Sequence, residues 1–211
     1  MSLSGIVRSR AIPRAILRYS AIALALAALL VLPGCWVTSI NPLYEENVVS
    51  IKDPDLVFDQ RLIGSWIEVG DECNASLTIT AKDGVYDMQS TDESDGCAAS
   101  DKTGHYQARL VKLYPYYFLD LSPIANEVCG MCIARHNIFL AKFDKTTLSI
   151  TPVDSDWLKK SLAAKTISLA TLGDDTDTIT ASSKDLKAFC RKFAGNTKVF
   201  KPESTPTFKR K

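Results

Sequence analysis

Short segments in which apolar and polar residues alternate dominate the chain from residue 61 to residue 151. The clearest pair lies at 77–81 and 85–88, where Asp83-Gly84 between them is typical of a hairpin turn. β-Branched and aromatic residues, which favour strands, are frequent in all of these segments. Further strands are predicted at 105–113, 116–121, 134–143 and 148–151. The pattern therefore predicts a meander of antiparallel strands.

After residue 151 the pattern changes. Asp154 or Ser155 can cap a short helix, and 166–172 is predicted to form another strand. The acidic run from residue 174 to residue 177 is predicted to be a solvated turn. Ser182 and Asp185 then form a capping box in front of an apolar face at helical spacing. Two late helices are therefore expected.

Together these elements predict a mainly β (α+β) fold, a small antiparallel barrel or sandwich with one or two C-terminal helices. Composition and length suit one hydrophobic core. Residues 57–201 are predicted to be a single β-rich domain that ends in a helix and a short strand. The proline-containing segment 35–56 is predicted to be a tether, and 202–211 a loose tail.

The first 34 residues have a different character. Four arginines and no acidic residue precede a uniformly apolar run at 21–32, and Leu32-Pro33-Gly34-Cys35 follows. This segment resembles the signal peptide of a bacterial lipoprotein, whose lipobox ends in a small residue and a lipidated cysteine. The apolar run is shorter than the ~20 residues of a membrane-spanning helix. An A-x-A cleavage site is absent, and Pro33 stands where the lipobox usually has a small residue.

The resemblance implies that residues 1–34 are cleaved off and that Cys35 becomes acylated. Acyl chains anchor a protein because each buried CH₂ contributes about 0.8 kcal/mol. In such lipoproteins an aspartate beside the lipidated cysteine favours retention in the inner membrane. Trp36 occupies that position here. The resemblance therefore implies a protein anchored by its N-terminal acyl chains to the outer membrane, facing the periplasm.

Removal of residues 1–34 also changes the charge. It takes away four of the 25 Lys and Arg and none of the 24 Asp and Glu, which leaves a net charge of −3. This balance argues against nucleic acid as a partner.

Five cysteines follow Cys35, and an exported chain meets an oxidising compartment in which disulfides persist. The simplest pairing joins Cys73 with Cys97 and Cys129 with Cys132, although connectivity cannot be deduced from sequence. Cys190 is predicted to be the free thiol, because it lies on the apolar face of the second helix. A buried free cysteine behaves as a small hydrophobic residue.

Gly64-Ser65-Trp66 near the first strand, the meander and the helix close to the C-terminus together resemble the lipocalins. In that family the tryptophan of G-x-W closes one end of the barrel, so the resemblance implies a structural role for Trp66. Three stretches, 62–66, 117–121 and 180–186, are similar to uncharacterised lipoproteins of Gram-negative bacteria. That family has no assigned activity.

The motif Cys129-Gly130-Met131-Cys132 has chemical precedent. A C-x-x-C pair can be redox-active when its first thiol lies at a helix N-terminus. Here it lies between strands, with no βαβ pattern around it, which favours a structural clip. With His136 and His105 the pair could ligate zinc, but thiolates must stay reduced and export argues against that. We therefore expect no metal, and a hydrogen-bonded His136 at the barrel rim.

Nothing in the sequence points to hydrolytic chemistry. G-x-S-x-G is absent, and only His105 and His136 could act as a base. The aromatic cluster Tyr114, Tyr116, Tyr117 and Phe118 could line a pocket or a partner surface, with core packing as the alternative.

The sequence thus predicts a non-enzymatic lipoprotein without a cofactor, which binds a small apolar ligand or an envelope partner. Two other functions stay open. One is a thiol-disulfide protein using Cys129 and Cys132. The other is an inhibitor of a periplasmic or foreign enzyme, presented on the loop at 90–103.

Overall fold

The computed structural model describes residues 36–45, 53–70, 75–91, 103–124 and 134–211, all within one unit, Cys35–Lys211. The signal segment and five of the predicted site residues lie outside these ranges: Cys35, Cys73, Cys97, Cys129 and Cys132.

Eight antiparallel strands close into a barrel. In chain order they are β3 (Gly64–Glu68), β4 (Ser76–Lys82), β5 (Val85–Thr91), β6 (Thr103–Leu113), β7 (Tyr116–Pro123), β8 (His136–Phe143), β9 (Thr147–Pro152) and β12 (Thr207–Arg210). Each strand pairs with the next, and β12 pairs with both β9 and β3, which closes the ring. The predicted mainly β fold with a small antiparallel barrel is confirmed.

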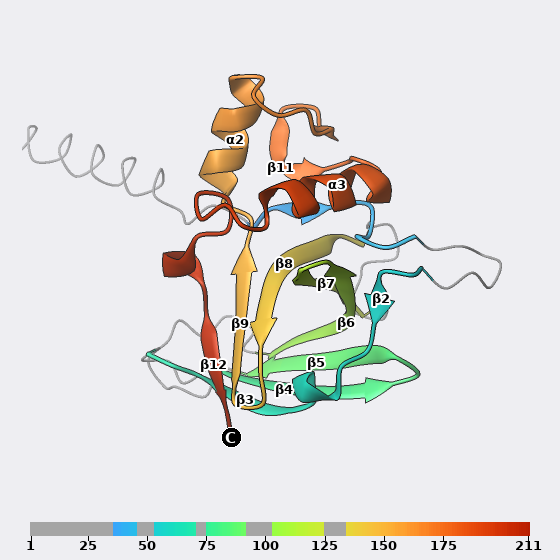
Figure 1. Ribbon diagram of the computed structural model, residues 1–211, viewed down its shortest axis with the longest axis vertical. Helices are drawn as coiled ribbons and strands as arrows, with labels where there is room; N and C mark the ends of the chain where they lie inside the picture. Colours follow the sequence, from blue (N-terminus) through green and yellow to red (C-terminus); the bar gives the residue numbers. More distant parts are fainter. Residues whose placement is uncertain (1–35, 46–52, 71–74, 92–102, 125–133) are drawn as a thin grey trace, which may run out of the picture. The chain divides into compact units, whose positions relative to one another are not determined.

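In the sequence, both helices fall between β9 and β12, the last two barrel strands. In space they lie on one side of the barrel (Figure 1). This insertion contains α2 (Ser155–Ala163), β10 (Thr171–Leu172), β11 (Asp175–Ile179), α3 (Ser183–Phe193) and the 3₁₀ helix η3 (Pro202–Ser204). Two short early strands, β1 (Thr38–Ser39) and β2 (Leu56–Val57), pair with β8 and β6, and β1 also runs parallel to β11. The 3₁₀ helix η1 (Gln60–Leu62) leads into β3.

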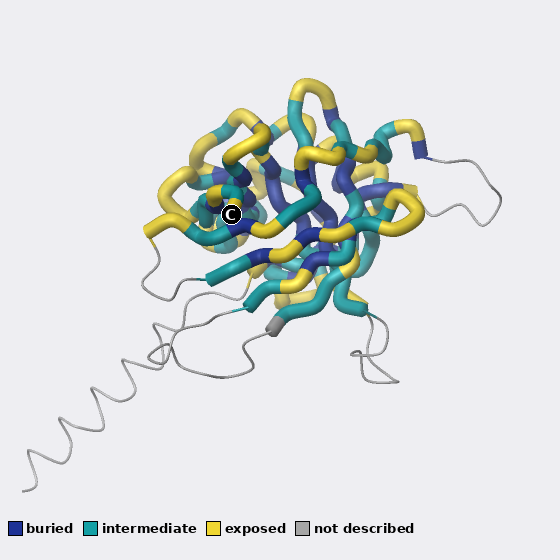
Figure 2. The backbone as a smooth tube through the Cα atoms, turned by 90° about the horizontal axis from the view of Figure 1, so that it is seen from below, coloured by how far each residue is buried: buried dark blue, intermediate teal, exposed yellow. Residues whose placement is uncertain are grey.

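Two hydrophobic cores follow from the alternation along the strands. Leu77 and Ile79 point into the barrel and are buried, whereas Thr78 and Thr80 between them are exposed. Figure 2 shows the same alternation of buried and exposed positions along the barrel strands. The second core lies outside the barrel, where buried residues of β6–β8 pack against the inner face of α3. The barrel interior and the helical layer are therefore separate packing units.

Both helix starts agree with the sequence. The Asp154 carboxylate accepts a hydrogen bond from the backbone N–H of Trp157 at 2.7 Å, which caps α2. The Ser182 hydroxyl accepts from the Asp185 N–H at 3.2 Å and donates to the Asp185 carboxylate at 2.7 Å, which caps α3. These bonds satisfy N–H groups that a helix leaves unpaired at its first turn.

The predicted loose tail at 202–211 is wrong. Residues Thr207–Arg210 form β12, whose Phe208 is buried in the barrel while the neighbouring Lys209 is exposed. A strand of four residues is too short for its alternation to be recognised. It is held in place because it has a paired neighbour on each side.

The predicted tether at 35–56 is also wrong for the residues that the structure describes. Val37, Leu43 and Tyr44 are buried in the core under the helices. These residues show no period because they are covered by elements far away in sequence, α3 and β8 among them. The folded domain therefore begins at or before Trp36 rather than at residue 57.

Two smaller expectations also differ. Within the predicted strand 166–172 only Thr171–Leu172 is a strand, and the predicted turn at 174–177 overlaps β11. Asp175 accepts hydrogen bonds from the Asp177 N–H at 3.1 Å and the Thr178 hydroxyl at 2.6 Å. These local bonds accommodate an acidic residue in a short strand.

Candidate functional site

One end of the barrel is closed by packed side chains. Trp66 is fully buried there, and its indole N–H donates to the carbonyl of Leu62 at 3.0 Å. The Arg210 guanidinium lies 4.2 Å from the centre of the Trp66 ring. It also donates to the carbonyls of Arg61, Ile63 and Lys145, at 2.5, 2.7 and 2.7 Å. Trp66 and Arg210 therefore join three chain segments at this end.

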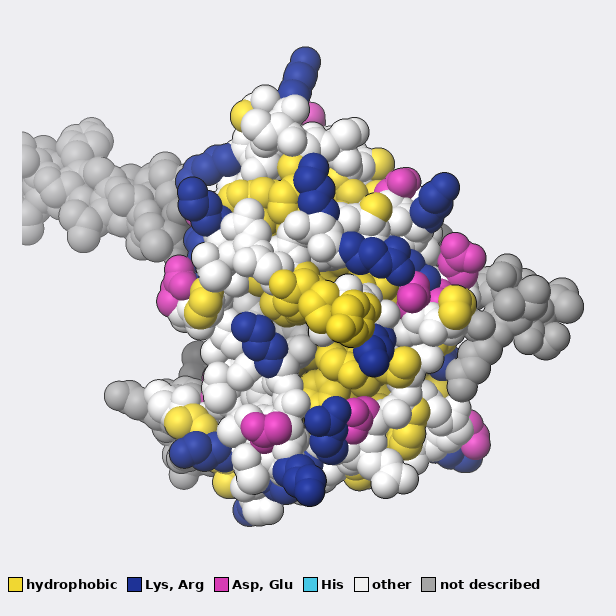
Figure 3. All heavy atoms as spheres, viewed as in Figure 1, with side chains coloured by type: hydrophobic (Ala, Val, Ile, Leu, Met, Phe, Trp, Pro, Cys, Tyr) yellow, Lys and Arg dark blue, Asp and Glu magenta, His cyan; other side chains and the backbone are white. Residues whose placement is uncertain are grey.

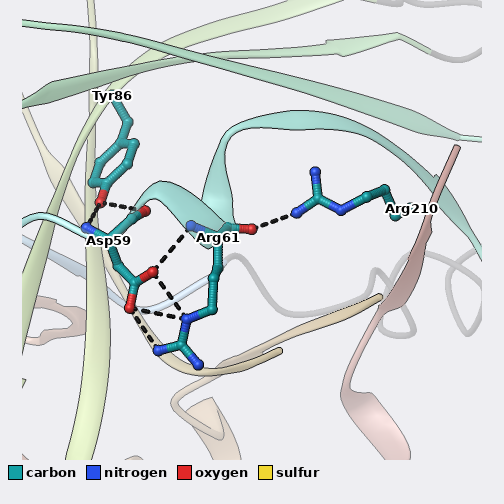
Figure 4. A network of polar contacts seen from close by, with 4 residues as sticks. All are labelled: Asp59, Arg61, Tyr86 and Arg210. Carbon is teal, nitrogen blue, oxygen red and sulfur yellow. Dashed lines mark hydrogen bonds and ion pairs between the residues drawn. The ribbon is translucent and has the colours of Figure 1, made fainter. Parts of the chain in front are cut away.

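Asp59 extends this network (Figure 4). Its backbone N–H donates to the hydroxyl of Tyr86 at 2.6 Å, and that hydroxyl donates to the Asp59 carbonyl at 3.1 Å. The Asp59 carboxylate accepts from the Arg61 guanidinium at 2.6 Å, which lowers the pKa of Asp59. The start of the barrel is thus fixed to a strand in its wall.

A cavity of about 360 Å³ lies at the other end of the barrel interior. Its walls are six buried apolar side chains: Leu77, Met88, Leu121, Phe139, Ile150 and Phe208. They come from β4, β5, β7, β8, β9 and β12, so that most of the barrel contributes. Trp66 does not line this cavity. Along β3 and β12 the closed end and the cavity lie in opposite directions, because Arg210 pairs with Trp66 whereas Phe208 pairs with Glu68 of the cavity lining.

The rim of the cavity is more polar than its walls. Glu68, Ser76, Ser90, Tyr106 and Asn137 lie there and are partly exposed. Trp36 completes the rim with its ring edge-on to Phe139, at 5.3 Å between ring centres and 89° between planes. An apolar interior with a few polar groups at its mouth is the usual composition of a small-molecule site.

The lining residues offer little to catalysis. Among those that the structure describes, only the Glu68 carboxyl and the Tyr106 phenol are ionisable, and both belong to the rim. The walls carry no nucleophile, base or oxyanion donor. Such a cavity can exclude water from an apolar ligand, and this is what its chemistry favours.

The two histidines contribute to the fold instead. His136 bonds through Nδ1 to the carboxylate of Asp120 at 2.7 Å, so it is hydrogen-bonded as expected. It does not lie at the cavity rim, because its ring packs against Tyr44 of the core outside the barrel. Asp120 is 2% exposed and also accepts from the backbone N–H of Leu43 at 2.5 Å. His105 meets a different carboxylate, that of Asp87, at 2.9 Å. Asp120 thus links residues 36–45 to the barrel.

No three metal-ligating side chains come together in the described part of the chain. The zinc hypothesis and the thiol-disulfide hypothesis depend on Cys129 and Cys132, and the inhibitor hypothesis depends on a loop that is largely 92–102. All of these lie outside the described residues.

The aromatic cluster does not form one surface. Tyr114 is 84% exposed at a hairpin tip, whereas Phe118 is fully buried in the core under the helices. Tyr117 packs against Phe143 with 5.3 Å between ring centres. Tyr116 is half-buried and lines a cleft beside Gly195 on the outside of the barrel. None of the four lines the barrel cavity.

Cys190 is 1% exposed on the inner face of α3 and carries a free thiol. Burial raises the pKa of this thiol, and the nearby Asp120 carboxylate raises it further. The thiolate, the reactive form, is therefore suppressed.

Sequence reasoning missed a buried ion pair and most of the cavity. Lys187 Nζ lies 2.6 Å from a carboxylate oxygen of Asp53 and 2.8 Å from one of Asp55. Asp53 and Lys187 are 134 residues apart, and no local pattern announces their contact. In the sequence, Trp36 was informative only as the residue that follows the lipobox cysteine, and nothing indicated that it lies at a cavity.

Figure 3 shows hydrophobic side chains exposed in the middle of the face below α3, among lysine and arginine side chains. Exposed apolar atoms make up more than half of an ordinary protein surface. The cavity, in which six buried apolar side chains converge, is therefore the stronger candidate site.

Comparison with protein-family models, with curated proteins and with solved structures found no match to this chain. Among the described helices, none has the length and apolarity that crossing a bilayer requires.

Proposed function

We propose that this protein is a non-enzymatic lipoprotein, anchored to the outer membrane through Cys35 and facing the periplasm, whose barrel binds a small apolar ligand. The observation that supports the ligand most strongly is the apolar cavity beside Trp36 and Phe139. The lipobox at Leu32–Cys35 supports the anchor.

The cavity limits the size of the ligand. Its 360 Å³ lie at the small end of the range for ligand sites. With about 30 Å³ for each water-sized group, roughly a dozen such groups fill it. This suits a medium-length alkyl chain or the end of a longer one. A flat or bulky ring system would meet the packed side chains around Trp66.

The same numbers predict the affinity. Ten methylenes at about 0.8 kcal/mol each contribute roughly 8 kcal/mol on transfer from water. Loss of ligand freedom offsets part of this gain. The dissociation constant should therefore be micromolar or weaker.

The test uses residues 35–211 with Cys35→Ser, titrated with N-dansyl undecylamine, whose alkyl chain can enter the cavity while the dansyl ring stays at the mouth and reports binding by its fluorescence. Ala75, which immediately precedes β4, also lines the cavity, so Ala75→Phe places a ring there; Thr78→Phe places the same ring on an exposed position of β4 as its control. We expect saturable binding that Ala75→Phe weakens at least tenfold and Thr78→Phe leaves unchanged. Absence of saturable binding, or equal binding by all three proteins, would refute the ligand proposal.

The anchor is tested separately. Intact mass of the protein from the envelope should exceed that of residues 35–211 by a diacylglyceryl group, and Cys35→Ser should abolish the increase. An unmodified mass would refute the lipoprotein proposal while leaving the cavity untouched.

A further inference from the structure

The first residue that the structure describes belongs to the cavity rim. Trp36 packs edge-on against Phe139 of the cavity wall and is still 58% exposed. The next residue, Val37, is 7% exposed in the second core. Thr38 then pairs with Asn137 of β8 on one side and Thr178 of β11 on the other. The described segment 36–45 is therefore held in the fold from its first residue.

This leaves no free spacer between the anchor position and the barrel. Consecutive Cα atoms are 3.8 Å apart. Acyl chains on Cys35 would thus begin one residue away from a side chain of the rim. A tether at 35–56 would have let the barrel turn in any direction. The buried Val37 and Leu43 remove that freedom.

The rim also has the chemistry of a membrane contact. Tryptophan is enriched where the hydrocarbon meets the headgroups, because its ring is apolar and its N–H is polar. Trp36 is one of only five large hydrophobic side chains exposed in the described part of the chain. Directly beside it lie the apolar walls of the cavity, with Ser76 and Ser90 at the edge. Headgroups can meet the polar rim while an alkyl chain enters.

From these observations we infer that the end of the barrel that holds the cavity faces the bilayer, and that its ligand is an acyl chain of a membrane lipid, which enters past Trp36. The inference rests on the proposed function, because it takes both the anchor and the apolar cavity as given. It adds the class of ligand and the direction from which the ligand arrives. A soluble molecule of the periplasm would have to reach the cavity through the side that faces the lipid.

The orientation is tested by fluorescence quenching. The acylated full-length protein is reconstituted into phosphatidylethanolamine and phosphatidylglycerol vesicles that carry a doxyl group high on the acyl chain. We expect the vesicles to quench tryptophan fluorescence, and Trp36→Phe to remove at least half of that quenching. Trp157→Phe, which changes a tryptophan packed against α3, should leave it nearly unchanged. Quenching that does not depend on Trp36 would overturn the orientation.

The ligand class is tested by photocrosslinking in the same vesicles. A phospholipid with a diazirine at the end of its acyl chain should label the cavity walls, at residues such as Met88, Leu121 and Phe139. Ala75→Phe should reduce this labelling at least fivefold. Labelling confined to the outer surface would overturn the inference. So would intramolecular crosslinks from a diazirine fatty acid attached to Cys35, since they would identify the anchor itself as the occupant.

The two levels of the proposal can fail separately. If N-dansyl undecylamine binds the Cys35→Ser protein but Trp36 is not quenched, the cavity function stands and the membrane-facing mouth is wrong. If no probe binds and no cavity residue is crosslinked, the proposed ligand function itself is wrong.

Discussion

Replacing Arg210 should open the closed end of the barrel. Arg210→Met keeps much of the aliphatic stem and removes the guanidinium. The variant loses three hydrogen bonds, to the carbonyls of Arg61, Ile63 and Lys145, and the stacking on Trp66. Two of these bonds are exposed to solvent, so we assign about 0.5 kcal/mol to each of them and about 1 kcal/mol to the third. The contact with the ring adds about 1 kcal/mol.

The sum predicts that the free energy of unfolding falls by about 3 kcal/mol. Urea unfolding followed by tryptophan fluorescence and circular dichroism measures this loss, and a thermal midpoint about 6–12 °C lower should accompany it. Lys209→Met is the matched control, because Lys209 is exposed on the same strand. It should change stability by less than 0.5 kcal/mol, a typical limit for surface positions.

Gly64→Ala should act on the same contact from the other side. Gly64 has a φ of 140°, which favours glycine, and a Cβ there would overlap Nη1 of Arg210. The double variant should therefore lose less than the two single losses added together. Additive losses of unfolding free energy, or an Arg210→Met protein as stable as the wild type, would refute the role of Arg210 in stabilising this end of the barrel.

Three further predictions concern the titratable groups. Lys187→Met should reduce the free energy of unfolding by about 3–5 kcal/mol, because it leaves the buried Asp53 carboxylate without its cation. Lys184→Met, at an exposed position of the same helix, should be nearly neutral. Urea unfolding measures both. Burial acts to raise the pKa of Asp53, but the hydrogen bonds from Lys187 and from two backbone N–H groups outweigh it and leave that pKa lowered. The stability that Asp53 contributes is thus fully present above pH ~4 and is lost as the pH falls further. Wild type should therefore lose more stability than Asp53→Asn between pH 4 and pH 2, and parallel curves would contradict this. The Cys190 thiol should react with Ellman's reagent only after unfolding in urea, and a faster reaction of the native wild type than of native Cys190→Ala would show that this thiol is not buried.

The sequence predicts an element well when residues close to it in the chain determine its structure. The hairpin at 77–88 and the cap at Ser182 are set by neighbouring residues, and both appear as predicted. The strand Thr207–Arg210 was missed because its stability comes from β3 and β9 on either side. Trp36 was assigned to a tether because the residues that hold it, such as Phe139, are about a hundred positions away. The walls of the cavity come from six strands, so no single segment of the sequence has a pattern that predicts the cavity.

Calorimetric titration of laurate into residues 35–211 with Cys35→Ser tests most directly whether the barrel cavity holds an alkyl chain. One laurate should bind per chain with a dissociation constant that is micromolar or weaker, and with the negative heat-capacity change that burial of apolar surface produces. Ala75→Phe should abolish that signal at the same concentrations. No heat of binding at several temperatures, or the same affinity with the cavity filled by Ala75→Phe, would contradict binding of an alkyl chain in the cavity.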